Sequence, residues 1–211
     1  MAEPYTDIER STLQCIIGAG SIKESELKKI HNKFKYSLKR DDNGDDIEDE
    51  SVMTDEAWHM FDRTLQTAVD LIIIKIRVLG YTIVRTISQL SGVPFYVYVN
   101  TVSDEPAKIS VQRSAKEISM IKKVIDHIIA DCEDESFAIT TKDALKFCTY
   151  EGFTSSQSLH FLQSLVNEGW LNLAKSGQYT LSIRALTELK PMLVEKYGIT
   201  GKDSEGLLNV C

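Results

Sequence analysis

The fold is decided by two short stretches of sequence, residues 79–87 (LGYTIVRTI) and residues 168–173 (EGWLNL). In each stretch a glycine ends an apolar helical pattern, an aromatic residue follows, and the hydrophobic period changes from about 3.6 residues to 2. Glycine adopts the backbone conformations that end a helix, and alternating β-branched or aromatic residues favour a strand. Each stretch therefore predicts a helix that leads directly into a β-hairpin.

The first half of the chain reads as three helices and a hairpin. Ser21-x-x-Glu24 matches a capping box, which predicts that a second helix starts there, and Thr54 is expected to start a long third helix. The predicted first helix covers residues 4–17, and the predicted two-stranded ribbon covers residues 81–87 and 95–100.

The second half repeats this order. Helices are expected to open at the capping patterns Ser114-x-x-Glu117, Thr140-x-x-Asp143 and Thr154-x-x-Gln157. They are followed by strands at 170–173 and 179–183 and by a last helix over 185–197, which Pro191 should kink unless it marks the first turn.

Three helices closed by a β-ribbon make a winged helix. The sequence therefore predicts a mainly α fold with small β-ribbons, an α+β class, built from tandem winged-helix domains. The predicted first domain covers residues 1–103 and includes an acidic loop at 41–50; the second covers residues 104–198, and residues 199–211 form a linker.

The composition excludes several classes of protein. The chain has 211 residues, 43% of them hydrophobic, and a formal net charge of −7, which argues against a surface shaped throughout for nucleic acid. Four cysteines without paired spacing predict reduced thiols. The longest aliphatic run, residues 71–74, ends at Lys75, so no membrane span is expected.

No catalytic or metal-binding motif is found. The four histidines are scattered and the cysteines are single, so the paired ligands that wrap a zinc ion are missing. There is no Gly-x-Ser-x-Gly elbow, and the glycines at 18–20 follow a helical pattern, unlike a dinucleotide loop. We therefore expect no cofactor within residues 1–211.

A basic second helix is the candidate for contact with nucleic acid. It carries Lys28, Lys29, Lys33 and Lys35, which could neutralise phosphates, although a solvated helix face is the alternative. The third helix of the second domain has no basic residue except His160, and the turn of its wing offers only Lys175. Because sequence reading needs donors on that helix, weak non-specific DNA binding is the most that we expect.

Apolar residues on the third helix and the returning strand are the candidates for a protein-docking surface. They are Ile72, Ile73, Phe95, Tyr96 and Tyr98. The strand has apolar side chains on both faces, and residues 71–74 are apolar all round the helix. These residues either fill the core or form a surface that a partner buries.

Several segments resemble one family, non-SMC element one, the winged-helix and RING-like subunit of the Smc five–six complex. The resembling segments are 79–85 (LGYTIVR), 95–100 (FYVYVN), 162–171 (LxxLVxxGWL), 177–181 (GQYTL) and 184–189 (RALxEL). They are spread over residues 58–197, and their common order is more specific than any one of them.

The resemblance implies partners and a location. It implies docking to a MAGE-type winged-helix subunit and, through it, to a kleisin and the Smc heads, in the nucleus and on chromatin. A transcription regulator with tandem winged helices that bind DNA is the alternative.

The resemblance also implies a RING-like domain with ubiquitin ligase activity beyond the second winged helix. Zinc and a ubiquitin-conjugating enzyme are expected only if that domain follows residue 211. Cys211 stands where its first ligand pair would begin, so it is the candidate metal ligand. Whether the protein is an enzyme stays open.

Overall fold

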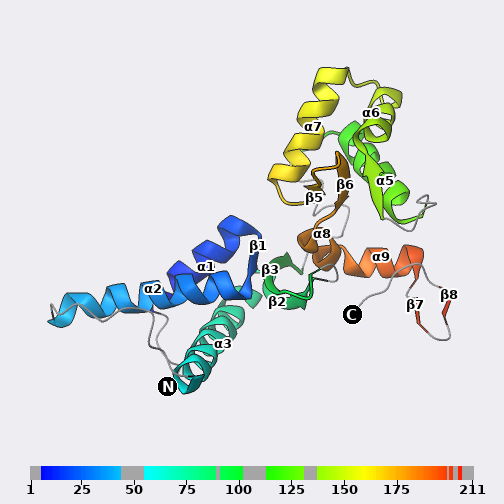
Figure 1. Cartoon of the computed structure of the whole chain (residues 1–211). Coiled ribbons are helices and arrows are strands. Elements are labelled where there is room, and N and C mark those ends of the chain that lie inside the picture. The colour runs from blue at the N-terminus through cyan, green and yellow to red at the C-terminus, as the bar shows by residue number, and fades with distance from the viewer. Residues whose placement is uncertain are drawn as a thin grey trace. The chain divides into compact units, whose positions relative to one another are not determined.

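The computed structural model describes residues 6–43, 55–88, 91–101, 113–130, 137–198, 200–201 and 204–205. The chain divides into two compact units, unit 1 over Met1–Thr101 and unit 2 over Val102–Cys211. Each unit packs helices against a three-stranded antiparallel sheet in the order of a winged helix (Figure 1). The predicted fold class is confirmed.

Unit 1 follows the order helix, strand, helix, helix, hairpin. Its elements are α1 (Asp7–Ala19), β1 (Ser21–Lys23), α2 (Glu24–Asn43), α3 (Asp55–Arg77), β2 (Tyr81–Ile87) and β3 (Pro94–Asn100). A capping box starts α1, because the Thr6 amide donates to the Glu9 carboxylate over 2.7 Å. After α3 the chain turns at Gly80, whose φ of 78° is a conformation that favours glycine.

The sheet of unit 1 has the strand order β1-β3-β2. Its central strand β3 pairs Tyr96 with Ile22 on one side and with Arg85 on the other. One face of the sheet packs against the three helices, and the core there is made by Ile16, Ile22, Leu27, Leu65, Val69, Ile72, Ile76, Ile83 and Tyr96. The core therefore fixes which face of α3 points inward.

Two expectations for unit 1 are wrong. The ribbon has three strands, and Ser21 belongs to the third strand, β1, so the helix starts only at Glu24. The Glu24 carboxylate accepts a hydrogen bond from Arg85 Nε of β2 at 2.7 Å, where a capping box would need it to return to the amide of Ser21. Pairing with β3 satisfies the backbone of this segment, and a local pattern does not reveal such a long-range pairing.

Unit 2 repeats the arrangement. Its elements are α5 (Ala115–Ile129), β4 (Ala138–Thr140), α6 (Thr141–Tyr150), α7 (Ser155–Asn167), β5 (Leu171–Leu173), β6 (Gln178–Leu181), α8 (Ile183–Glu188), α9 (Lys190–Tyr197), β7 (Thr200–Gly201) and β8 (Ser204–Glu205). The capping boxes predicted at Ser114 and Thr154 are confirmed, and the Thr140 hydroxyl caps α6. Gly169 turns the chain into β5 with a φ of 75°.

Unit 2 also departs from the expectation in two places. Its sheet has the order β4-β6-β5, so a short strand before α6 was missed for the same reason as β1. The single helix expected over 185–197 is two helices that meet at Leu189, and Pro191 lies in the first turn of α9. Proline is favoured there because the amide of a first-turn residue has no partner within the helix.

Candidate protein-docking surface

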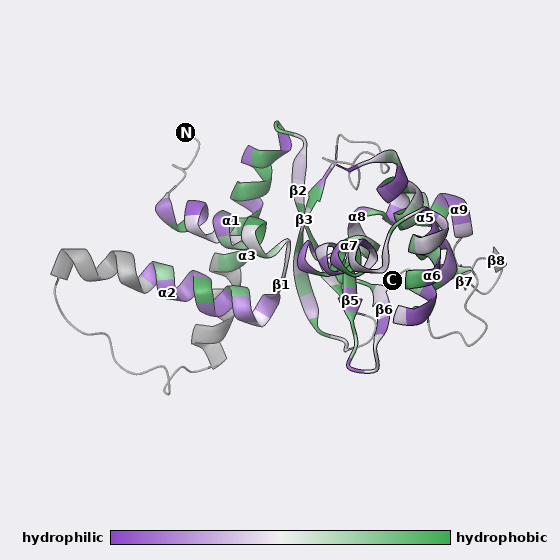
Figure 2. Ribbon diagram, turned by 90° about the horizontal axis from the view of Figure 1, so that it is seen from above, coloured by the Kyte–Doolittle hydropathy of each residue, from purple (hydrophilic) through white to green (hydrophobic). Residues whose placement is uncertain are grey.

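The C-terminal end of α3 and the turn that follows it expose three aliphatic side chains. Ile74 is 65% exposed, Val78 85% and Leu79 71%. We call these three residues the α3 patch. Figure 2 colours most of this end of the helix as hydrophobic. Single exposed aliphatic residues are ordinary on a protein surface, whereas large contiguous apolar patches mark surfaces at which other molecules bind, so these three residues are a candidate for such a surface.

Within the α3 patch, Ile74 lies on the opposite side of the helix from the core. Ile72 and Ile76 are 0% and 5% exposed, whereas Ile74, between them, points to solvent. Val78 and Leu79 lie in the turn that follows α3 after Arg77, and the Leu79 amide of this turn donates to the Ile76 carbonyl. Burial of the inner face holds α3 in place, so the outer face is presented by a fixed element of the unit.

The border of the α3 patch is basic. Lys75 and Arg77 stand in the last turn of α3, and neither forms an ion pair with another described residue. The acidic Asp70, one turn earlier, accepts a hydrogen bond from the Gln66 side chain at 2.9 Å. Cations at the C-terminal end of a helix also complement its dipole.

Two of the five predicted docking residues are buried in the core of unit 1. Ile72 is fully buried, and Tyr96 is 3% exposed. Ile73 and Tyr98 are partly buried and pack against the same core, and the Tyr98 ring stacks on that of Tyr81 at 5.0 Å between centroids. Only Phe95 is partly exposed without being part of that core. Docking through these five residues stays a prediction, and the exposed surface lies beside them, on the α3 patch.

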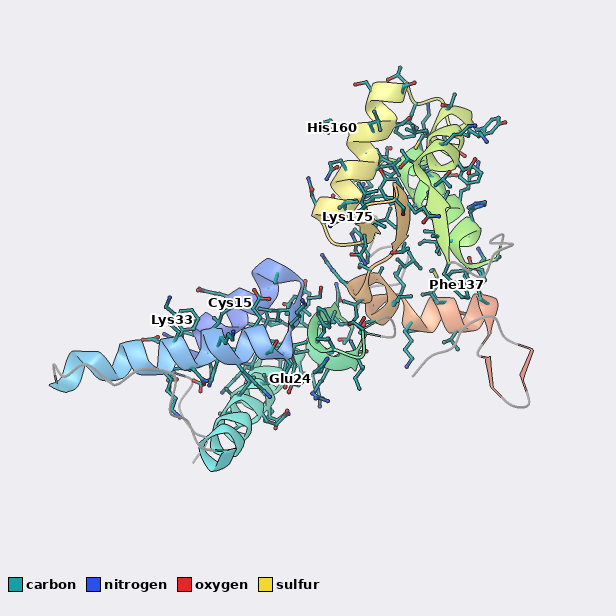
Figure 3. The ribbon with its side chains drawn as sticks, viewed as in Figure 1. Cys15, Glu24, Lys33, Phe137, His160 and Lys175 are labelled. Atoms are coloured by element: carbon teal, nitrogen blue, oxygen red, sulfur yellow. The ribbon has the colours of Figure 1, made fainter. Side chains whose placement is uncertain are left out.

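Glu24 ties the start of α2 to the sheet. Its carboxylate pairs with Arg85 Nε at 2.7 Å and with Lys28 Nζ at 3.0 Å (Figure 3). Burial alone would raise the pKa of Glu24, but the hydrogen bonds from Arg85 and Lys28 outweigh it, so the pKa lies below its ordinary value. Burial raises the pKa of Tyr96, which stands opposite Arg85 in the pairing of β3 with β2.

A buried histidine joins α1 to α2. His31 is 1% exposed, and its Nδ1 lies 2.9 Å from the Thr12 hydroxyl, which itself donates to the Ile8 carbonyl at 2.8 Å. The imidazole must therefore donate from Nδ1, which leaves Nε2 as an acceptor without a partner among the described residues. Burial lowers the pKa of His31, and the charge of Lys35 lowers it further.

The four candidate lysines for nucleic acid do not form one cluster. Lys29 and Lys33 are four residues apart and share a face of α2, whereas Lys28 and Lys35, seven residues apart, share another. Lys28 already pairs with Glu24. Lys33 projects from α2 (Figure 3), and it and Lys35 also interact with other groups. DNA binding by this helix remains a prediction.

The helix of unit 2 that would read DNA is α7. Its exposed side presents Leu159, His160 and Gln163, and the β5–β6 turn presents Lys175 (Figure 3). Leu159 is 50% exposed, so the outer face of α7 is polar and apolar with hardly any charge. Phosphate contacts need cations, and this face is poorly supplied with them.

Within the part of the chain that the structure describes, no group of three or more His, Cys, Asp or Glu residues could hold a metal ion. Cys211, the candidate zinc ligand, and most of the predicted linker lie outside the described residues. No helix among the described residues is long and apolar enough to cross a membrane.

Comparison with known families decides the identity of this fold. The family described as "Nse1 non-SMC component of SMC5-6 complex" matches residues 9–189, which include both winged helices. The chain belongs to the Nse1 family. The resemblance found in the sequence is confirmed.

Nse1-family relatives match along the whole chain. The "Non-structural maintenance of chromosomes element 1 homolog" of Mus musculus is 24% identical over 215 residues, which cover 100% of this chain and 70% of the relative. The Homo sapiens homologue is 23% identical over 211 residues, with 98% and 69% covered. A solved structure titled "Nse1-Nse3-Nse4 complex" matches with a TM-score of 0.72 and 20% identity, over 92% of this chain and 75% of that one. The likeness to this solved structure supports the winged-helix fold of the chain.

The sequence-predicted docking residues lie close to the α3 patch, but the three exposed residues of the patch itself are not among them. Residues 71–74 are aliphatic without a break, so apolar side chains point both toward the core and away from it along this part of the helix. One signal was present: Leu71, Ile74 and Val78 repeat at three and four residues, on a second apolar stripe beside the one that fills the core. The core of unit 1 buries one of these two apolar stripes, so the second stripe is available to contact another molecule.

Proposed function

We propose that this chain is a docking subunit of the Smc five–six chromosome-maintenance and DNA-repair complex. It binds a MAGE-type winged-helix subunit and, through that subunit, is joined to a kleisin and the Smc heads. The chain then acts in the nucleus on chromatin. Membership of the Nse1 family supports this proposal, as does the likeness to a structure whose title names Nse3 and Nse4 beside Nse1.

One observation carries the proposal: the α3 patch is aliphatic and exposed, and the described residues of its own unit leave it uncovered. In helix-turn-helix proteins that read DNA, side chains of the recognition helix contact the base edges. Here the exposed end of α3 presents Ile74 and the turn after it presents Val78, and neither side chain can pair with base edges or phosphates. Covering these side chains with apolar groups of a partner protein removes their surface from water, which is the main driving force of protein association.

Co-expression of the chain with the MAGE-type subunit of its own organism tests the proposal. We expect a one-to-one complex in size-exclusion chromatography with light scattering. Val78→Asp should weaken that complex by more than about 100-fold, because a buried, unpaired carboxylate costs several kcal/mol. The free chain should keep its fold, since Val78 is 85% exposed.

Leu173→Asp is the matched control. Leu173 is an aliphatic residue of β5 in unit 2 and is 45% exposed, so the substitution introduces the same charge on a different surface. We expect it to leave the complex intact. Failure of the unmodified chain to form any complex would refute the proposed function, and equal effects of the two substitutions would refute the assignment to the α3 patch.

Ubiquitin ligase activity is a separate proposal for the family to which the chain belongs. A RING-like domain needs a full set of zinc ligands, and the described residues hold no such set. If the encoded protein has a RING-like domain, we propose that the two winged helices position it within the complex. Zinc content and ubiquitin transfer by the full-length protein, with a conjugating enzyme present, are the measurements that decide it.

A further inference from the structure

Unit 2 has an open groove between α5 and α9, with a volume of about 260 Å³. Its floor is made by Ile121 and Ile125, and its walls by the partly buried side chains of Ile118 and Met192. An aliphatic cavity of about 150 Å³ is large enough for a benzene molecule, so this groove has room for about two branched aliphatic side chains. The groove is lined by residues of unit 2 alone and does not involve the α3 patch.

The groove is shaped for an elongated occupant. The α5 residues that line it are spaced three and four positions apart over seven residues, which is about 10 Å along the helix. Met192 and Lys196 face them from α9, again four positions apart. A cleft between two helices fits the ridge of a third helix, and a methionine wall adapts to the side chains that enter.

The charges at the rim define the chemistry of the occupant. The Asp126 carboxylate accepts bonds from Lys196 Nζ at 2.5 Å and from the Tyr197 hydroxyl, which tie α9 to α5 at that end. Lys122 lies at the rim and forms no ion pair with any described residue. The groove therefore offers an apolar floor and one uncompensated positive charge.

We infer that this groove binds an amphipathic, acidic helix of a partner protein. Two aliphatic side chains of the helix, one turn apart, fill the space above Ile121 and Ile125, and an Asp or Glu beside them faces Lys122. This is the helix-in-groove mode of recognition, in which apolar anchors supply affinity and flanking charges set orientation. The inference concerns unit 2 and does not depend on the proposed docking of a MAGE-type subunit.

The test uses the purified chain and a designed probe peptide of about 16 residues. The peptide has leucines on one helical face and glutamates beside them, and a control peptide has the same composition with the leucines scattered. Methyl NMR spectra of the chain report binding through the Ile118, Ile125 and Met192 methyl groups. We expect saturable shifts of these three signals with the first peptide only.

Variants identify the site. Met192→Glu should abolish the shifts, and Ile118→Ala, which adds no charge, should weaken binding without any threat to the fold. Lys122→Glu should weaken it by roughly two- to fivefold, as expected for an exposed ion pair. Lys175→Glu, a charge reversal in the exposed β5–β6 turn, is the matched control and should have no effect.

Three results would overturn the inference. The first is the absence of shifts, or equal shifts with the scattered peptide. The second is a response of the same methyl groups to decanoate but not to the peptide, which would identify a small amphiphile as the occupant. The third is a change of these signals when residues 202–211 are deleted together with a gain of peptide binding, which would identify the chain's own C-terminal segment as the occupant.

Discussion

Replacing Ile72 and Ile74 by alanine, one at a time, tests which face of α3 holds the fold together. Ile72 is 0% exposed and Ile74 is 65% exposed, although they are two residues apart on one helix. Ile72→Ala removes three buried carbons, worth about 2.4 kcal/mol at roughly 0.8 kcal/mol each. The cavity that remains brings the usual loss to about 2–5 kcal/mol.

The expected effect at Ile74 is close to zero. About one third of its side chain is buried, so the lost transfer free energy is about 0.8 kcal/mol. Alanine has the higher helix propensity and returns up to about 0.7 kcal/mol. We therefore expect a difference of at least about 2 kcal/mol between the two variants.

Urea unfolding of the full chain, followed by circular dichroism, measures this difference. With a denaturant slope of about 2 kcal/mol per molar, the loss of about 2–5 kcal/mol should lower the unfolding midpoint of unit 1 by about 1–2.5 M in Ile72→Ala, and Ile74→Ala should leave the midpoint nearly unchanged. Equal losses would mean that α3 is not turned as described, and the α3 patch would then be part of the core.

Three further predictions concern titration and DNA. The pKa of His31 lies below its ordinary value of 6.5 in the folded chain, so on acidification the unfolded chain takes up this proton first, and the unfolding free energy should fall as the pH drops from about 7 towards 5. His31→Leu should make the unfolding free energy, measured by urea titration, depend less on pH in this range. An unchanged pH dependence would contradict the buried neutral imidazole. Arg85→Met should cost about 1–2 kcal/mol of unfolding free energy at pH 7. The pKa of Glu24 is lowered in the folded chain, so the ion pair stabilises the fold only while the Glu24 carboxylate is ionised, and the difference in unfolding free energy between the variant and the unmodified chain should narrow below pH 4.5. A difference that does not change with pH would show that the variant loses packing and not the ion pair. DNA binding, if detected by fluorescence anisotropy, should be independent of sequence and weaken roughly tenfold or more between 50 and 200 mM salt; a footprint on one site at 200 mM salt would contradict it.

The sequence predicted the parts of the fold that depend on local signals. Gly80 and Gly169 end helices where they were expected to, and the strand predicted over residues 81–87 is β2. The capping boxes at Ser114 and Thr154 also form as predicted. In these places a residue's own conformational preference and its neighbours within four positions decide the structure.

The parts that depend on distant pairing were not predictable in this way. Ser21–Lys23 is too short to show a strand period, and it becomes β1 only because β3, more than seventy residues later, supplies its hydrogen bonds. The stripe of Leu65, Ala68, Ile72 and Ile76 favours Ile72 over Ile74 for the core, but residues 71–74 are apolar all round the helix, so the sequence leaves open which of them are covered. That choice is made by the packing of α3 against the sheet and the other two helices, which the composition of the helix does not record.

Hydroxyl-radical footprinting of the chain, free and bound to its MAGE-type subunit, measures the central claim most directly. The rate of oxidation reports how much of each side chain is exposed to solvent. We expect the rates at Ile74, Val78 and Leu79 to fall severalfold in the complex, while that of Leu173 in unit 2 stays the same. Unchanged rates at the α3 patch in a complex that has formed would show that the partner docks elsewhere and would contradict the account.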